Sequence, residues 1–180
     1  NFITTHTFSE SDEDGWVFFA LSMTDSAGNE SGSLAETQDG SVVRFDGSPP
    51  TISSIIFFSN NTNDTTVCIP GDSLYLNYIT SEVLRTVEIT IAGIPPDRVY
   101  GSDNSYTAVY GMTGAETEGF IPFNIYDIED WVGNTGDPAS ETTNGSTVLF
   151  DMTPPADFTL GNVVSNGDNS GIEVPGYWNS

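Results

Sequence analysis

Short runs in which apolar and polar residues alternate occupy most of this chain, and they predict β-strands. Glycine, asparagine, aspartate and proline fill the gaps between the runs, and no stretch shows the 3.6-residue period of a helix. The sequence therefore predicts an all-β protein. The expected strands cover residues 52–58, 73–80, 86–92, 106–112, 120–126 and 147–151, with a short irregular piece near Arg98.

The alternation also predicts which side chains face a core, because successive residues of a strand point to opposite faces. Phe120 and Pro122 fall on the outward face of their strand. Six or seven strands in about 105 residues are typical of a β-sandwich. The expected inward residues are Leu74, Leu76, Tyr78, Val87, Ile89, Ile91, Ile121, Phe123, Ile125, Val148 and Phe150.

The chain contains an internal repeat. RFDGSPP at 44–50 returns as LFDMTPP at 149–155, and TDSAGN at 24–29 aligns with EDWVGN at 129–134 with the same spacing of 105 residues. Further upstream, DEDGWVFFAL at 12–21 aligns with ETEGFIPFNI at 116–125 with a spacing of 104, so one residue is inserted between the two blocks. The inward residues of the second copy are matched in the first by Val17, Phe19, Leu21, Val43 and Phe45.

The repeat divides the chain into three parts. We interpret residues 1–49 as the C-terminal part of one module, 50–154 as a complete module, and 155–180 as the start of a further, divergent module. The chain is then a window on a longer repetitive polypeptide. Each F-D-x-[ST]-P-P sequence closes a last strand, and its prolines restrict the link to the next module, as in a rod of stacked domains.

Composition limits the partners. The chain has 26 acidic residues, three arginines and no lysine, for a net charge of −23, which disfavours nucleic acid and anionic membranes. With 37% hydrophobic and 12% aromatic residues it has enough apolar material for a core and is not a disordered acidic tail. No run of about 18 apolar residues occurs, so we expect no direct insertion into a membrane.

The residues needed for nucleophilic catalysis are scarce. The chain has one histidine, His6, one cysteine, Cys68, and no G-x-S-x-G sequence. His6 aligns with Tyr110 in the repeat, as an ordinary strand residue would. We therefore expect a protein that is not an enzyme.

Oxygen ligands are plentiful, and they make calcium the expected cofactor, because calcium binds six to eight carboxylate, amide and backbone oxygens. A D-x-x-G-N loop and the aspartate of the linker are expected to meet at one pole of each module. The same loop also suits a simple turn, in which aspartate caps backbone amides and glycine takes positive φ. The sequence leaves both interpretations open. The candidate metal ligands are Asp25, Asn29 and Asp46 in the first copy, and Asp130, Asn134 and Asp151 in the second.

A family resemblance rests on the same residues. GDSLYLNYITSEVLRTVEITIAG, followed by YTAVYGMTGAETEGFIPFNIYDIEDWVGN and STVLFDMTPP, resembles the bacterial Ig-like repeats that form long tandem arrays on surface adhesins. The resemblance covers residues 1–154. It implies tandem Ig-like β-sandwich modules, an extracellular location on a bacterial cell surface, a spacer or stalk role without catalysis, and calcium held between modules.

Short sequences that resemble glycosylation motifs narrow the range of bacterial surface proteins that the chain resembles. N-x-[ST] occurs at Asn29, Asn60, Asn63 and Asn144, which is unsurprising in a chain of this composition. Asp25, Asp64 and Asp72 each begin a sequence similar to the D-[ST]-apolar O-glycosylation motif of gliding bacteria. These motifs favour large type 9-secreted surface proteins, including gliding adhesins.

Two other functions remain open. The modules could be building blocks of an extracellular filament or surface layer, which requires large contacts between chains. They could instead form an accessory glycan-binding module of a secreted enzyme, which requires a row of exposed aromatic side chains; Trp16, Phe18 and Trp131 are the candidates. The expected partners are neighbouring modules of the same chain and an unknown surface ligand, such as a glycan.

Overall fold

The computed structural model describes residues 3–9, 11–159 and 161. The described residues form strands, turns and loops, which confirms the all-β prediction. Within this part of the chain no helix is long and apolar enough to cross a membrane. The strands are β1 (Gly15–Trp16), β2 (Arg44–Phe45), β3 (Ile52–Ser59), β4 (Val67–Cys68), β5 (Ser73–Thr80), β6 (Thr86–Ile91), β7 (Arg98–Ser102), β8 (Ser105–Gly111), β9 (Gly119–Phe120), β10 (Phe123–Glu129) and β11 (Leu149–Phe150).

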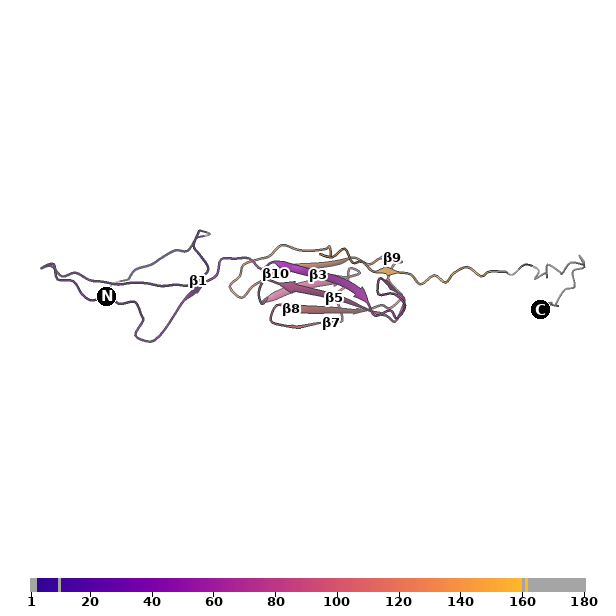
Figure 1. Cartoon of the computed structure of the whole chain (residues 1–180), viewed down its shortest axis with the longest axis horizontal. Helices are drawn as coiled ribbons and strands as arrows, with labels where there is room; N and C mark the ends of the chain where they lie inside the picture. The colour runs from indigo at the N-terminus through magenta and orange to yellow at the C-terminus, as the bar shows by residue number, and fades with distance from the viewer. Residues whose placement is uncertain (1–2, 10, 160, 162–180) are drawn as a thin grey trace, which may run out of the picture.

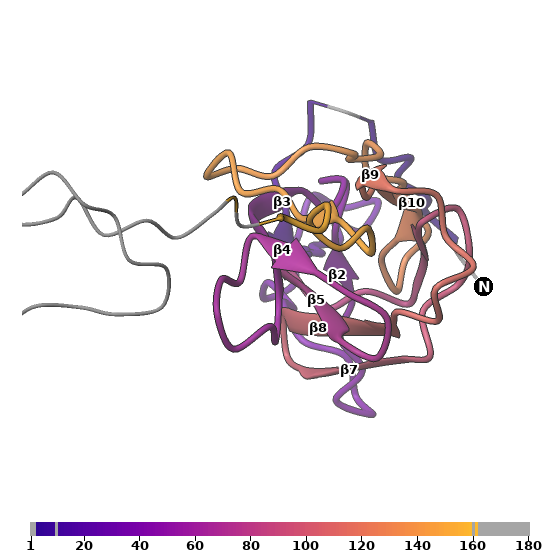
Figure 2. The ribbon, with the colours of Figure 1, turned by 90° about the vertical axis from the view of Figure 1, so that its right-hand side faces the viewer.

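Residues 50–154 form a sandwich-like fold of two layers. One layer is an antiparallel sheet in the order β3-β5-β8-β7, and the other combines the pair β10-β6 with the short sheet β4-β11-β9 (Figures 1 and 2). The rings of Phe57 and Phe123 meet between the layers, with centroids 5.4 Å apart. The chain enters the sandwich at one end and leaves it at the other (Figure 1).

The core confirms the predicted faces. Of the expected inward residues only Val87 is partly exposed, and the others are buried. Phe123 is 8% exposed, whereas the outward Phe120 is 71% exposed. Because the strands present one apolar and one polar side, two layers are enough to enclose the core.

The expected strand over 120–126 is wrong at Pro122. Two strands stand there instead: β9 pairs with β11, and β10 pairs with β6. Proline has no N–H for a ladder, and the Pro122 carbonyl accepts a bond from Ala92 N–H at 2.8 Å. The chain thus crosses between two pieces of the second layer at this residue.

Two further differences concern short strands. The piece near Arg98, expected to be irregular, is the regular edge strand β7, paired with β8 over five residues. Its side chains are all exposed, so it lacks the alternation by which strands are recognised. β4 was not expected, and it is a two-residue strand that runs parallel to β11.

The one-residue insertion in the repeat lies in a β-bulge. Between Tyr126 and Glu129 the register of β10 against β6 shifts, and Asp127 takes a positive φ of 50°. A bulge accommodates one extra residue in a strand without moving its neighbours to the other face of the sheet. The repeat spacing changes from 104 to 105 across this segment.

The described residues between 6 and 48 repeat a set of the contacts that residues 110–153 make among themselves. Gly15 pairs with Phe45 as Gly119 pairs with Phe150. The bridge between Leu21 and Leu34 corresponds to that between Ile125 and Ala139. Further equivalent bonds are Val17 N–H to Val43 O and Ile121 N–H to Val148 O, both 2.9 Å, and Thr37 Oγ1 to Ser41 O and Thr142 Oγ1 to Ser146 O, both 2.8 Å.

The first copy differs in lacking a second layer. Phe19, Leu21 and Val43, expected to face inward, are 45%, 47% and 60% exposed. The sequence places the front strands only in residues 50–154, which accounts for this exposure. The expected further module at 155–180 lies almost entirely outside the described residues.

Truncating Phe123 to alanine tests the packing of the sandwich. Phe123→Ala should lower the free energy of unfolding by about 3–5 kcal/mol, because it removes a buried ring and leaves a cavity. Phe120→Ala is the matched control and should cost much less. Denaturant melts of the full chain measure both, and equal losses would contradict the face assignment.

The hydroxyl of Tyr78 provides a second test. Tyr78 is 1% exposed, its ring stacks on Tyr106, and its OH has no hydrogen-bond partner among the described residues. A buried hydroxyl without a partner costs free energy, so Tyr78→Phe should leave the protein as stable or raise the free energy of unfolding by up to about 1 kcal/mol. Thermal melts compare it with the parent, and a clear loss would indicate that the hydroxyl is satisfied.

Candidate functional site

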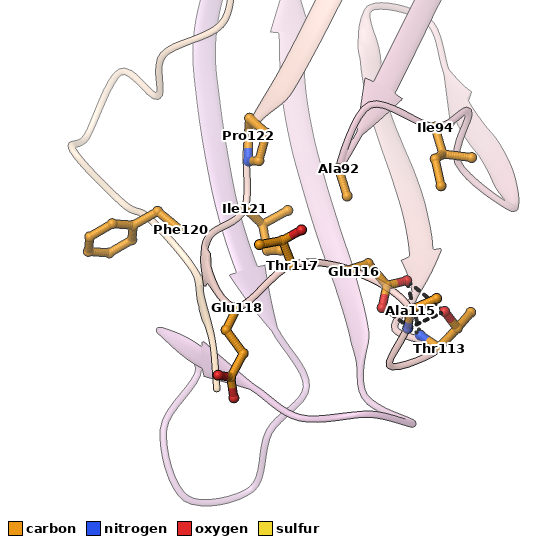
Figure 3. A pocket seen from close by; sticks show the side chains of 10 residues that line it. All are labelled: Ala92, Ile94, Thr113, Ala115, Glu116, Thr117, Glu118, Phe120, Ile121 and Pro122. Atoms are coloured by element: carbon orange, nitrogen blue, oxygen red, sulfur yellow. Dashed lines mark hydrogen bonds between the residues drawn. The ribbon is translucent and has the colours of Figure 1, made fainter. Parts of the chain in front are cut away.

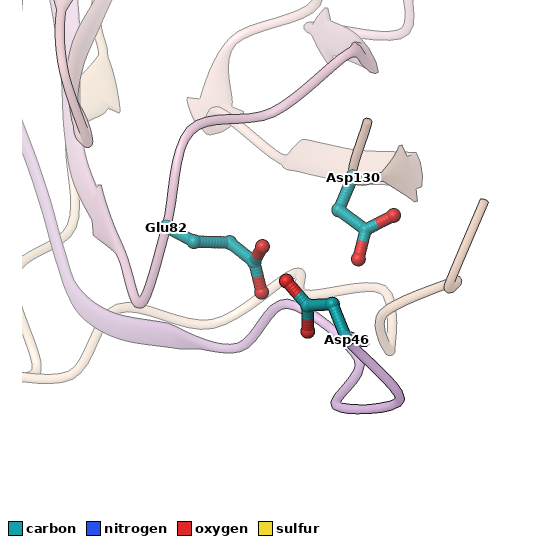
Figure 4. Close-up of side chains that lie close together, drawn as sticks. All are labelled: Asp46, Glu82 and Asp130. Carbon is teal, nitrogen blue, oxygen red and sulfur yellow. The ribbon is translucent and has the colours of Figure 1, made fainter. Parts of the chain in front are cut away.

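Three carboxylates converge where the first copy joins the sandwich. Asp46 comes from the linker, Glu82 from the turn after β5, and Asp130 from the end of β10 (Figure 4). Each offers an oxygen within 4.8 Å of the other two. This is about twice a calcium–oxygen bond length, so one ion could contact all three residues.

The loop of residues 130–134 positions Asp130. Its Oδ1 accepts bonds from the N–H groups of Val132, Gly133 and Asn134 at 2.7–2.9 Å, and its Oδ2 accepts one from Asn134 Nδ2 at 2.8 Å. The turn predicted from D-x-x-G-N is therefore present, with Gly133 at φ 103°. Burial opposes the charge, but these hydrogen bonds outweigh it and lower the pKa of Asp130.

The equivalent loop of the first copy forms the same turn. Asp25 accepts bonds from Ala27 N–H, Asn29 N–H and Asn29 Nδ2 at 2.8–2.9 Å. Its residues are exposed, and among the described residues Asp25 belongs to no group of three or more candidate metal ligands. Asp25 and Asn29 therefore close a turn by hydrogen bonds. Asp130 and Asn134 close the same turn, but at the junction with the linker.

Asn134 also ties the linker to the sandwich. Its Nδ2 donates to the backbone oxygens of Asp46 at 3.2 Å and Ser48 at 3.4 Å. Pro50 is buried nearby, and Gly136 passes so close to the Pro50 carbonyl that no side chain would fit there. These contacts bring the Asp46 carboxylate over the loop of Asp130.

Charge accumulates at this junction. Burial, and next the carboxylates of Asp46, Asp130 and Asp14, raise the pKa of Glu82, while Arg44 opposes them. The side chains of Asp46 and Glu82 accept no hydrogen bond from a described residue, which leaves their oxygens available. Together with water and backbone oxygens they suit a hard cation such as calcium.

The second linker has a different carboxylate contact. Glu118 accepts bonds from Met152 N–H at 2.7 Å and Thr153 Oγ1 at 2.8 Å. In the first copy Asp14 does the same with Gly47 N–H at 2.6 Å and Ser48 Oγ at 2.5 Å. The acid of each D-G or E-G step, directly before β1 or β9, thus holds its own linker in place.

The candidate metal ligands are grouped differently from the sequence expectation. Asp46 meets the loop of the following unit, not the Asp25 loop of its own copy, because linker and loop lie at opposite ends of one unit. Asp151 leaves the sandwich at the far end, where its Oδ1 accepts a bond from Thr153 N–H. Glu82 was missed, since no motif marks it and no equivalent exists in residues 1–49.

A pocket of about 430 Å³ lies between Ala92, Pro122 and Glu116 (Figure 3). Glu116 accepts bonds from Tyr110 OH at 2.8 Å, Thr113 Oγ1 at 2.9 Å and Gly114 N–H at 2.8 Å. Burial acts against its charge, but these bonds lower its pKa to about 2. The carboxylate is thus occupied in holding the loop closed.

The residues considered for catalysis are placed apart. His6 Nε2 lies 3.7 Å from Asp12 in an exposed contact that matches the bond between Tyr110 and Glu116. Cys68 is buried, and burial raises the pKa of its thiol to about 11. A thiol in this state is a core residue and a poor nucleophile.

The low pKa of Glu116 predicts a pH-dependent contribution to stability. Because its folded pKa lies below the ordinary value of 4.5, the contribution is present above pH 4.5 and is lost as the pH falls towards 2. Glu116→Gln should lower the free energy of unfolding by about 1–3 kcal/mol at pH 7.

Denaturant melts at several pH values measure the difference between parent and variant. The exposed Glu141→Gln is the control and should have little effect at any pH. A Glu116→Gln deficit that stays constant between pH 7 and pH 2 would contradict the role of its charge.

Comparison with models of protein families, with curated proteins and with solved structures finds no match for this chain. The function must therefore be argued from the residues and their geometry.

Proposed function

We propose that this chain is a non-catalytic spacer segment of a long extracellular array of Ig-like sandwich modules, which presents a binding tip away from a bacterial cell surface. The observation that carries the proposal is the set of equivalent strand pairs, bridges and linker bonds within the described residues of 6–48 and within 110–153. Two stretches of different sequence that keep the same strand pairs, turns and linker contacts are what a tandem array requires.

The path of the chain supports a rod. The linker enters the sandwich at one end and the next linker leaves at the other, so successive modules would extend along one direction (Figure 1). Each linker combines a proline pair with a carboxylate, Asp14 or Glu118, that holds its backbone. Restricted linkers transmit length and direction from one module to the next.

Calcium is the second part of the proposal. The ion would bind Asp46, Glu82 and Asp130 and join the linker to the following module. In its absence three carboxylates within 4.8 Å repel one another, so the ion would convert a repulsive contact into a cross-link. The extracellular bacterial setting, with type 9 secretion, rests on the sequence resemblance.

The exposed aromatic residues give less support to glycan binding. Trp16 and Phe18 line one depression and Trp131 lines another, at the junction. A glycan platform needs its aromatic rings in one row, which these residues do not form. Assembly into a filament remains the alternative, and the mass of the chain in solution distinguishes it.

Calorimetry tests the metal site. The parent chain should bind one calcium ion with a dissociation constant of about 0.1–1 mM, the range of extracellular modules. Glu82→Gln should weaken binding at least about tenfold, because it removes one charged ligand. The Glu82 carboxylate accepts no hydrogen bond from a described residue, so the substitution should leave the fold unaffected.

Glu141→Gln and Asp151→Asn are the matched controls and should bind as the parent does. Equal binding by Glu82→Gln and the parent, or no heat of binding at all, would exclude this site.

Small-angle scattering and light scattering test the spacer. The chain should be an elongated monomer, and calcium should narrow the distribution of its dimensions in the parent but not in Glu82→Gln. Coinciding curves in calcium and chelator would contradict stiffening. A mass that keeps rising with concentration would support the filament instead.

A further inference from the structure

The first copy carries an apolar face without a cover. Val17, Phe19, Ala35 and Val43 line a groove of about 700 Å³, together with Trp16 and Phe18. Scattered exposed apolar residues are normal, but a contiguous apolar face on a soluble chain marks an interaction surface. The question is what binds to it.

The same chain shows what covers an equivalent face. Phe123, Ile125 and Val148 are the counterparts of Phe19, Leu21 and Val43, and they are 8%, 0% and 0% exposed. Their cover is the layer β3-β5-β8-β7, and β6 pairs with β10 beside them in their own layer. A front half of this kind therefore has the shape and apolar pattern that the open face requires.

Backbone groups point to the same occupant. In the sandwich the front half bonds the back half through Asp151 N–H to Cys68 O, Ala92 N–H to Pro122 O, and Arg85 N–H to Glu129 O, at 2.8–3.1 Å. The counterparts in the first copy are Asp46 N–H and the carbonyls of Phe18 and Thr24. None of these three bonds a backbone partner within the described ranges.

We propose that the open face of residues 11–49 binds a front half of the type of residues 50–104, joined to it on its N-terminal side. The register follows from His6 and Ser9, whose contacts with Asp12 match those of Tyr110 and Thr113 with Glu116. In this register residues 50–104 are the part of the complete module that has no aligned counterpart in the first copy. The inference deepens the proposed array by naming the partner of this surface.

A chain with a copy of residues 50–104 placed before Asn1 tests the proposal. Amide hydrogen exchange reads the N–H groups of Leu21 and Leu34, which bond each other's carbonyls at 2.8 and 2.9 Å. Adding the front half should slow their exchange at least about a hundredfold, towards the rates of Ile125 and Ala139. Unchanged rates would overturn the proposal.

Two substitutions in the extended chain show which face is used. Phe19→Asp should abolish the slowing, because this ring would lie inside the new core. Ala20→Asp should not, since Ala20 does not line the groove and its counterpart Asn124 is exposed in the sandwich. An equal effect of both variants would count against the proposed face.

The parent chain provides the remaining comparison. If Leu21 and Leu34 already exchange slowly in a parent dimer, a second copy covers the face and the proposal is wrong. If the added segment displaces residues 50–104 from their own sandwich, Leu21 stays unprotected, and the proposal is equally wrong. The exchange rates do not depend on calcium binding, so the proposed metal site can fail separately.

Discussion

The need to cover an apolar sheet face with a second layer governs this structure. Residues 50–154 satisfy it, since Phe57 on the front layer meets Phe123 on the back layer and the inward residues of both are buried. Residues 11–49 keep the strand pairs, turns and linker contacts of the back layer but leave its inner side open. The comparison separates what local hydrogen bonds achieve from what burial adds: local contacts define the course of the chain, and burial stabilises it.

The linkers depend on this framework at both ends. Asp14 and Glu118 each accept hydrogen bonds from a backbone N–H and a hydroxyl of the linker that follows their own unit. They hold that linker where it leaves the unit. Asn134 holds the first linker on the side of the unit that it enters. A proline pair removes backbone freedom between these two attachments. Such an attachment at each end restricts the angle between units, which a flexible linker would leave free.

Negative charge also accumulates at the junction between the first linker and the sandwich. The junction brings Asp46, Glu82 and Asp130 together, and the raised pKa of Glu82 reflects first its burial and then its acidic neighbours. In a chain with a net charge of −23, a cation at this point would relieve local repulsion where units meet. In the Asp25 loop the aspartate accepts hydrogen bonds from two backbone N–H groups and from the side-chain amide of Asn29.

Much of the fold could be predicted from the sequence because its signals are local. Alternation predicted the main strands of residues 50–154 and their inward residues, and the two D-x-x-G-N sequences predicted the turns. The strand predictions failed where the local sequence pattern and the actual strand pairing disagree. Pro122 interrupts an apparently continuous strand, and β7 is regular although its side chains are all exposed, since β8 alone determines its pairing.

The candidate site was only half predictable. Asp46, Asp130 and Asn134 were identified by their place in repeated motifs, which is information that the sequence itself contains. That Asp46 meets the loop of the following unit, and not the Asp25 loop of its own copy, was decided by the tertiary structure, because the linker leaves a unit at the end opposite to its loop. Glu82 has no motif and no copy in residues 1–49; only the folding of the turn after β5 towards the linker brings its carboxylate to the other two.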